Sequence, residues 1–249
     1  MKCQHIVIVG ASSTIAEHCA RLWASRPLTR LTLIGRSSAR LQRVATDLAI
    51  RAPGVQLQCL SVDLLNPSAI AATSRRLAEE GQIDQVLIAH GDLPQQRECQ
   101  QYLSLSEQAL LVNGISPALW AEAFAGHLQQ VNHGRLAVIG SVAGDRGRRS
   151  NYVYGAAKGL LERYVQGLQH RFAGTAVKVT LIKPGPTDTT MTAHLRAQGQ
   201  SLASPEHVAR RIVDAMQRGQ LVCYAPARWR WIMAVLVALP TRIFHRLDI

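Results

Sequence analysis

The chain has 249 residues, of which 47% are hydrophobic, 5% aromatic and 18% charged. This length and apolar content fit one sizeable globular domain and exclude disordered, collagen-like and small disulfide-stapled classes of protein. The formal net charge is +12, but the basic side chains are dispersed and aromatic residues are scarce, so we expect no nucleic-acid partner.

Short apolar runs alternate along the chain with segments whose apolar residues recur at helical spacing. The first run, residues 5–9, ends at Gly10 and leads into a predicted helix over residues 13–26. The six further predicted strands cover residues 31–34, 55–62, 86–89, 136–139, 177–182 and 221–224. The five further predicted helices cover residues 39–50, 68–80, 102–130, 154–172 and 205–218.

Strands that are apolar on both faces and separated by helices are joined in parallel by right-handed crossovers, which place helices on both faces of one sheet. We therefore expect an α/β fold with a doubly wound parallel sheet of the Rossmann type, with seven strands. No linker-like stretch divides residues 1–225, which we predict to be one domain. Residues 226–249 form a separate basic amphipathic tail.

The cysteines are odd in number and lack metal-knuckle spacing, which is typical of a reducing compartment. The histidines form no HExxH motif, so we predict no metal site. The first apolar run is too short for a secretory signal, and the longest one, residues 231–239, is too short to span a bilayer. We expect a cytoplasmic protein.

In a doubly wound sheet, ligands bind beyond the carboxyl ends of the strands. The loop after the first strand carries Gly10 and leads into a helix whose N-terminus favours the pyrophosphate of a dinucleotide. The alternative is an ordinary turn that Ser12 or Ser13 caps. The candidate cofactor contacts in this loop are Gly10, Ser12, Ser13, Thr14 and Ile15.

The end of the second strand indicates which dinucleotide binds. An NAD site needs a carboxylate about 20 residues after the glycine loop, but no acidic residue lies between Glu17 and Asp47. Arg36, Ser37 and Arg40 follow the strand instead, and guanidinium and hydroxyl groups suit a 2′-phosphate. The pattern predicts NADP(H), against the alternative of a solvated arginine at a helix start.

Three further residues form a catalytic constellation. Ser141 follows the fifth predicted strand, and Tyr154 and Lys158 are four residues apart, so they share one face of the next helix. An ammonium group near a phenol stabilises the phenolate and lowers a pKa that is ordinarily about 10. Such a pair suits proton transfer, with Ser141 holding the substrate oxygen.

The serine followed by Tyr154-Gly-Ala-Ala-Lys158 resembles the short-chain dehydrogenase/reductase family, and the resemblance covers essentially the whole domain. It implies that Asn113 completes the catalytic set with Ser141. It also implies that Asp63 and Leu64 contact adenine. The residues that it assigns to the nicotinamide side are Pro184, Gly185, Thr187 and Thr189.

This sequence departs from the family pattern in two places. Thr14 and Ala16 stand where the family usually has glycines. Residues 89–91, Ala89-His90-Gly91, stand where the family has Asn-Asn-Ala-Gly. His90 either contacts the cofactor ribose or fills space.

The resemblance implies hydride transfer from NADPH to a carbonyl carbon while Tyr154 protonates the oxygen. In that mechanism Lys158 tunes Tyr154 and binds the ribose, Ser141 positions the carbonyl, and Asn113 holds a water that relays protons to Lys158. Family members pair through their fourth and fifth helices, so the resemblance also implies a homodimer or homotetramer.

The tail, residues 226–249, has arginines on both sides of an apolar block with tryptophan at its edge. This pattern is typical of a helix lying at a lipid headgroup boundary, and the alternative is a helix buried in a subunit interface or on the domain surface. The tail, residues 10–17 and residues 183–192 are similar to the family branch that includes decaprenylphosphoryl-2-keto-ribose reductases.

That similarity implies a lipid-linked keto-sugar substrate and a peripheral position on the inner face of the cytoplasmic membrane. Two other hypotheses stay open. One is a soluble ketoreductase of a small or carrier-bound ketone, and the other is a non-catalytic NADP-binding regulator.

Overall fold

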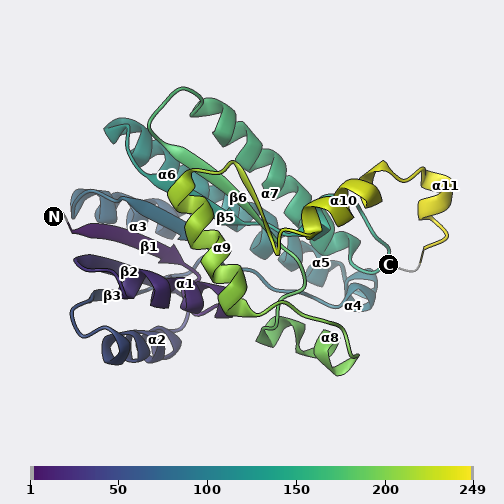
Figure 1. Ribbon diagram of the computed structural model, residues 1–249, viewed down its shortest axis with the longest axis horizontal. Coiled ribbons are helices and arrows are strands. Elements are labelled where there is room, and N and C mark those ends of the chain that lie inside the picture. Colours follow the sequence, from purple (N-terminus) through teal and green to yellow (C-terminus); the bar gives the residue numbers. More distant parts are fainter. Residues whose placement is uncertain (1–2, 248–249) are drawn as a thin grey trace.

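A parallel sheet of seven strands forms the centre of the computed structural model, which describes residues 3–247 (Figure 1). The strand order is β3-β2-β1-β4-β5-β6-β7. The strands are β1 (Gln4–Val9), β2 (Thr29–Gly35), β3 (Gln56–Ser61), β4 (Gln85–Ile88), β5 (Arg135–Ile139), β6 (Lys178–Pro184) and β7 (Val222–Ala225). The predicted doubly wound Rossmann fold is confirmed.

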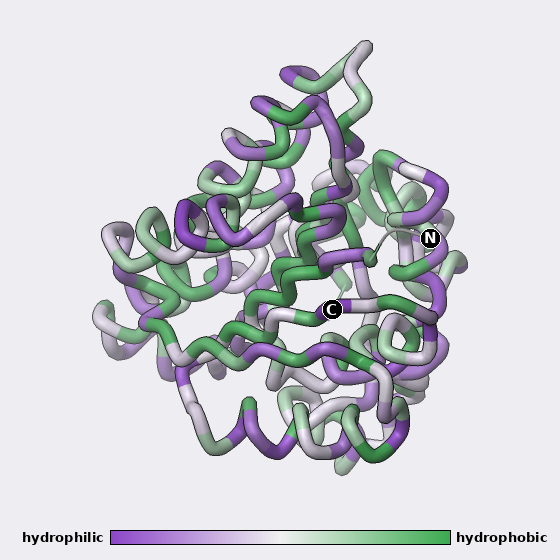
Figure 2. The backbone as a smooth tube through the Cα atoms, turned by 90° about the vertical axis from the view of Figure 1, so that its left-hand side faces the viewer, coloured by the Kyte–Doolittle hydropathy of each residue, from purple (hydrophilic) through white to green (hydrophobic). Residues whose placement is uncertain are grey.

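Alternating side chains of the strands supply two separate cores, one on each face of the sheet. Ile6 and Ile8 of β1 belong to one core, and Val7 and Val9 belong to the other. The first core packs under α1 (Thr14–Ala24), α2 (Ser38–Arg51) and α9 (Pro205–Arg218). The second packs under α3 (Pro67–Glu79), α6 (Ser116–Val131) and α7 (Tyr152–Arg171). In Figure 2 the strands run as a largely hydrophobic band between these helices.

Capping residues set the helix starts. The hydroxyl of Ser13 accepts a hydrogen bond from the Ala16 amide at the start of α1, and Ser37 caps α2 in the same way. Asn66 and Ser204 cap α3 and α9, each followed by a proline at the first helical position. Such caps satisfy amide groups that a helix N-terminus leaves unpaired.

The predicted helix over residues 102–130 is helical from Leu103 to Val131, but it is not uniform. It consists of α5 (Leu103–Leu110), a π-helical turn η1 (Leu111–Ile115) and α6. The apolar patterns of the sequence did not indicate the short helices α4 (Gln96–Gln101) and α8 (Ala193–Ala197) or the 3-10 turns η2 (Val142–Gly144) and η3 (Thr190–Thr192).

After β7 the chain forms α10 (Trp229–Ala238) and α11 (Thr241–Phe244), and α11 projects beyond the rest of the fold in Figure 1. Met233 of α10 is buried, whereas Trp231 and Val235 are 72% and 63% exposed. Within residues 3–247, no helix has the length and hydropathy that crossing a bilayer requires.

Candidate active site

A cavity of about 710 Å³ lies at the carboxyl edge of the sheet. It is centred where the strand order reverses, because β1 has β2 on one side and β4 on the other. The predicted site residues that line it are Gly10, Ser12, Ser13, Thr14, Ile15, Arg36, Ser37, Arg40, Leu64, Ala89, His90, Gly91, Asn113, Ser141, Tyr154, Lys158, Pro184, Gly185, Thr187 and Thr189.

Gly10 lets the loop after β1 lie directly against the loop after β4. Its φ is +79°, and a Cβ atom there would lie 2.5 Å from the His90 amide nitrogen. Both the left-handed conformation and this contact favour glycine. Ala16 is fully buried in the core under α1, so its methyl group takes no space from the cavity.

Arg36 and Arg40 line the cavity at the end of β2, and both side chains are exposed. Within residues 3–247 neither guanidinium has an ion-pair or hydrogen-bond partner. Ser37 caps α2 next to them. The arrangement presents two unpaired cations where a dinucleotide-binding sheet holds the adenosine ribose.

Asp63 is the predicted contact that the structure does not bring into the cavity lining. Its carboxylate accepts a hydrogen bond from the Leu65 amide at 3.0 Å, and the side chain is exposed. Leu64 and Leu65, which follow it, line the cavity instead.

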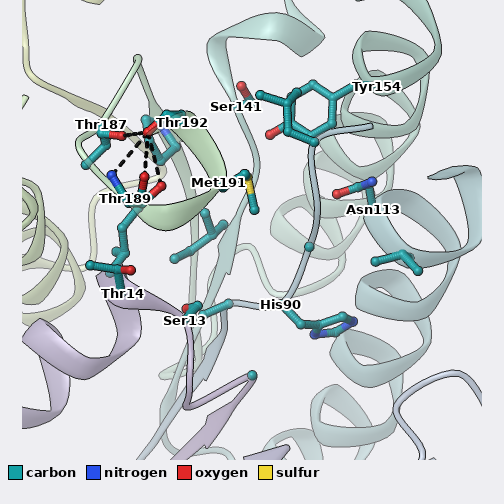
Figure 3. Close-up of a pocket in the computed structure, with 18 of the residues that line it drawn as sticks. Ser13, Thr14, His90, Asn113, Ser141, Tyr154, Thr187, Thr189, Met191 and Thr192 are labelled. Atoms are coloured by element: carbon teal, nitrogen blue, oxygen red, sulfur yellow. Dashed lines mark hydrogen bonds between the residues drawn. The ribbon is translucent and has the colours of Figure 1, made fainter. Parts of the chain in front are cut away.

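The His90 ring is directed away from Ser13 and Thr14 (Figure 3) and lies 2.8 Å from the Ser116 hydroxyl. That hydroxyl has one proton and donates it to the Leu64 carbonyl at 2.6 Å, so the His90 Nε2 must be the donor toward Ser116. Burial lowers the pKa of His90 to about 3, so the ring is neutral. The imidazole therefore ties the loop after β4 to α6.

Ser141 and Tyr154 lie side by side at one end of the cavity (Figure 3). Ser141 caps η2, where its hydroxyl accepts a hydrogen bond from the Ala143 amide at 3.1 Å. Burial raises the pKa of Tyr154 to about 12, although a hydrogen bond with Ser141 opposes this shift. The phenol therefore carries its proton at neutral pH and is available as a general acid.

Lys158 lies one helical turn after Tyr154 and is 3% exposed. Its Nζ donates to the Ile139 carbonyl at 3.1 Å and lies 5.7 Å from the centre of the Tyr154 ring. Burial lowers the pKa of Lys158 to about 8. The sequence predicted that this ammonium group lowers the pKa of Tyr154, but burial of the phenol dominates and the pKa is raised instead.

Asn113 lies in the π-helical turn η1, a feature that is frequent at functional sites. Gly114 allows η1 to pack on α7, because a Cβ atom there would lie 2.9 Å from the Ala157 carbonyl. The Asn113 amide donates to the Asp92 carboxylate at 2.6 Å and to the Ala109 carbonyl at 3.0 Å. These contacts fix the amide fully inside the fold.

Gly91 packs directly against the Asn113 side chain, close to Lys158. A Cβ atom at Gly91 would lie 2.8 Å from the Asn113 Oδ1 and 3.6 Å from the Lys158 Nζ. The contact with the Asn113 Oδ1 is too short for a Cβ atom, so it favours glycine at position 91.

The loop after β6 is held by its own threonines. The Thr187 hydroxyl donates to the Gly185 carbonyl at 2.9 Å, and the Thr192 hydroxyl donates to the Thr187 carbonyl (Figure 3). The Thr189 amide donates to the Thr192 hydroxyl at 3.1 Å. These hydrogen bonds fix the conformation of the loop that lines the cavity on the side opposite Tyr154.

A buried ionic cluster lies behind the site. Lys183 Nζ lies 2.7 Å from Asp145 and 2.8 Å from Glu162, and the Tyr224 hydroxyl donates to Asp145 at 2.9 Å. The Lys183 and Asp145 side chains are each 5% exposed. Asp145 directly follows η2, so the cluster joins β6 and β7 to the segment that carries Ser141.

Several lining residues were missed by the sequence analysis. Arg148 and Asn151 lie between η2 and α7, and Met191 and Leu195 lie after β6. The run Arg146-Gly-Arg148-Arg149, just before the tyrosine helix, was the available signal for a polar wall. Within the described residues, no group of three or more His, Cys, Asp or Glu side chains is arranged to hold a metal ion.

Comparison with known proteins agrees with this geometry. Residues 4–200 match the family model of the short chain dehydrogenases. An uncharacterized oxidoreductase of Streptomyces coelicolor is 28% identical over 243 residues, which are 97% of this chain and 95% of that protein.

Two solved structures share the fold. A short-chain dehydrogenase from Sphingobium yanoikuyae in complex with NADPH has a TM-score of 0.80 and 24% identity, and the match covers 96% of this chain and 97% of that one. A short chain dehydrogenase from Burkholderia cenocepacia in complex with NADP has a TM-score of 0.82 and 19% identity, covering 100% of this chain and 98% of that one. The family match over most of the chain, together with this fold, shows that the protein belongs to the short-chain dehydrogenase/reductase family of oxidoreductases.

Proposed function

We propose that the protein is an NADPH-dependent carbonyl reductase. The observation that carries this proposal is the position of Tyr154, which keeps its proton at neutral pH, beside Ser141 and Lys158 in the cavity wall. An acid of this kind is what a carbonyl oxygen needs as it becomes an alcohol.

The cavity fits a dinucleotide that carries a 2′-phosphate. The contact between Gly10 and His90 leaves the N-terminus of α1 open to a pyrophosphate, with Ser12, Ser13, Thr14 and Ile15 around it. Arg36, Ser37 and Arg40 would hold the 2′-phosphate. Leu64 and Leu65 would border the adenine, Ala89 and Gly91 the ribose, and Pro184, Gly185, Thr187 and Thr189 the nicotinamide.

Bound NADPH would supply the hydride that the carbonyl carbon accepts. Ser141 holds the carbonyl oxygen by a hydrogen bond, and Tyr154 donates its proton to that oxygen. The Lys158 ammonium stabilises the phenolate that Tyr154 leaves behind and binds the cofactor ribose. A water held by Asn113 would return a proton to the pair through Lys158.

Replacing Arg36 by alanine is expected to raise the KM for NADPH by about 10- to 100-fold, because a charge-assisted hydrogen bond to the 2′-phosphate is lost. The KM for NADH should stay within about threefold, because NADH lacks that phosphate. Steady-state kinetics with both cofactors measure the difference. Arg43→Ala on α2, where the side chain is 73% exposed and lies outside the cavity lining, is the matched control. Equal effects of Arg36→Ala on the two cofactors would count against a 2′-phosphate site.

We further propose that the substrate is a lipid-linked ketone, such as the keto-sugar of a polyprenyl-phosphate glycan precursor, which the protein meets at a membrane surface. Trp231, Val235, Val237 and Ile243 of the tail are between 50% and 72% exposed. The tail also carries Arg228, Arg230, Arg242 and Arg246. An outward apolar face bordered by arginines suits an anionic lipid surface.

The tail is attached next to the active site. Arg146, in the segment between Ser141 and Tyr154, donates from Nη1 to the Leu236, Val237 and Leu239 carbonyls at 2.5, 3.1 and 2.8 Å. Its guanidinium also lies 3.8 Å from the centre of the Phe244 ring. A lipid bound at the tail would therefore lie close to the segment that joins Ser141 to Tyr154.

Replacing Trp231 by glutamate is expected to reduce binding to vesicles of phosphatidylglycerol and phosphatidylcholine by more than about tenfold, because it puts a charge in the apolar face. Co-sedimentation measures the bound fraction. Ile50→Glu on α2 is the control, since Ile50 is 75% exposed and far along the chain from the tail. If the wild-type protein stays in the supernatant with anionic vesicles, the proposal of a lipid-linked substrate is contradicted.

That outcome would favour the soluble ketoreductase, whose ketone is small or carrier-bound. The non-catalytic NADP-binding regulator is disfavoured, because Ser141, Tyr154 and Lys158 are all present and line one cavity. We also propose a homodimer or homotetramer that pairs through α5 and α7. Apolar side chains there, including Leu103 and Leu160, are 83% and 43% exposed.

A further inference from the structure

Two side chains in the cavity wall each have a buried polar atom that makes no hydrogen bond within the described part of the chain. Arg148 and Asn151 occupy one turn, in which the backbone N–H of Asn151 donates to the backbone carbonyl of Arg148 at 3.1 Å. Both residues line the cavity. Within residues 3–247 the buried Arg148 Nε and the buried Asn151 Oδ1 have no hydrogen-bond partner. Leaving such atoms buried and unpaired is costly unless a ligand pairs with them.

The carboxylate that acts on Arg148 is already bound elsewhere. Asp145 lies close enough for its charge to raise the pKa of Arg148, but the pKa is lowered because burial dominates. The Asp145 oxygens are held by Lys183 and Tyr224. The neighbouring Arg146 guanidinium already donates to the Leu236 and Leu239 carbonyls of the tail. Among the described residues, 3–247, Arg148 is thus a cation in the cavity wall without an ion-pair partner of its own.

Arg148 is also close to the reacting end of the cavity, since its charge lowers the pKa of Tyr154. We propose that Arg148, assisted by Asn151, forms a subsite that binds an oxyanion group, carboxylate or phosphate, of the carbonyl substrate. This inference rests on the proposed function and names the chemical class of its substrate. A planar guanidinium fork matches both oxyanions.

The subsite is separate from the place of the cofactor 2′-phosphate. Arg36 follows β2 and Arg148 follows β5, and β1 and β4 lie between these strands in the sheet. Three strand spacings of about 4.8 Å separate the two ends by roughly 14 Å. The two arginines therefore serve different ends of the cavity.

The test is equilibrium binding, so it does not depend on turnover. Three ketones with the same ring are compared by calorimetry on the complex of the protein with NADP⁺: acetophenone, para-acetylbenzoate and para-acetylphenyl phosphate. The wild type should bind at least one of the two anions about 10- to 100-fold more tightly than acetophenone, which is the range of a charge-assisted hydrogen bond. Which anion binds more tightly distinguishes the carboxylate from the phosphate.

Arg148→Gln should remove this preference and leave the binding of acetophenone and NADP⁺ within about threefold. Arg148→Lys should restore part of it, because the charge returns without the fork. The apparent Tm of Arg148→Gln without ligand should not fall, since the change removes an unpaired cation rather than one member of a pair. Arg149→Gln, next in sequence but outside the cavity lining, is the matched control for net charge.

Three results would overturn the subsite. They are anions that bind no better than acetophenone, a preference that survives Arg148→Gln, and an Arg148→Gln protein that loses NADP⁺ instead. Failure of the proposed function looks different, because the anion preference would then be intact while NADPH oxidation with the same ketones is absent.

Discussion

Replacing Tyr154 by phenylalanine is expected to lower kcat for carbonyl reduction by about 10²- to 10⁴-fold, the usual contribution of a general acid. The ring fills the same buried space, so the fold and the Kd for NADPH should stay unchanged. The variant lacks the proton that burial keeps on Tyr154 at neutral pH. Loss of NADPH absorbance with a ketone measures turnover, and cofactor fluorescence measures binding.

Tyr164→Phe is the matched control for this substitution. Tyr164 lies on the same helix, α7, and donates its hydroxyl proton to Glu122 at 2.8 Å, away from the cavity. Its loss should leave kcat near the wild-type value. Full turnover in the Tyr154→Phe protein would show that the phenol is not the proton donor.

Replacing Lys183 by methionine is expected to lower the free energy of unfolding by about 3–5 kcal/mol, as found when one partner of a buried ion pair is removed. Methionine keeps the length of the side chain but removes the cation that contacts both Asp145 and Glu162. Urea denaturation followed by circular dichroism measures the change. Lys178→Met, at the exposed start of the same strand, is the control and should cost less than about 1 kcal/mol.

The pH dependence of this difference has a definite sign. Burial lowers the pKa of Lys183, but the hydrogen bonds and charges of Asp145 and Glu162 outweigh it and raise the pKa above its ordinary 10.5. A raised folded-state pKa means that the stabilisation is complete below pH 10.5 and is lost as the pH rises through the folded value. The difference in the free energy of unfolding between wild type and Lys183→Met should therefore be largest at neutral pH and should decrease above pH 10.5. A difference in the free energy of unfolding that stays constant across this pH range would contradict stabilisation by the ion pairs of Lys183.

The strands and most helices could be predicted because their signals are local. Ile6 to Val9 are apolar on both faces, as a central parallel strand requires, and Ser13 and Ser37 mark helix starts by hydrogen bonds within a single turn. The expected set of Ser141, Tyr154 and Lys158 does line one cavity, because it follows from strand ends and helical spacing.

Other features depend on contacts between distant segments, which no local pattern encodes. The π-helical turn at Asn113 exists where Gly114 packs on Ala157, and neither residue alone indicates it. The role of His90 was open between ribose contact and filling space, and its hydrogen bond to Ser116 depends on a residue 26 positions away. The partners of Lys183 come from three other segments of the chain.

Arg146 makes the end of the chain part of the catalytic segment, and this affects how truncated proteins must be interpreted. Deleting the tail would remove the three carbonyl groups that accept hydrogen bonds from this guanidinium. It would also uncover Gly185, which lies under the Trp229 indole. A shortened protein should therefore turn over more slowly even in plain buffer with no lipid present. Slower turnover after truncation reports the loosening of two active-site loops, so only substitutions on the outward face can isolate what a bilayer contributes.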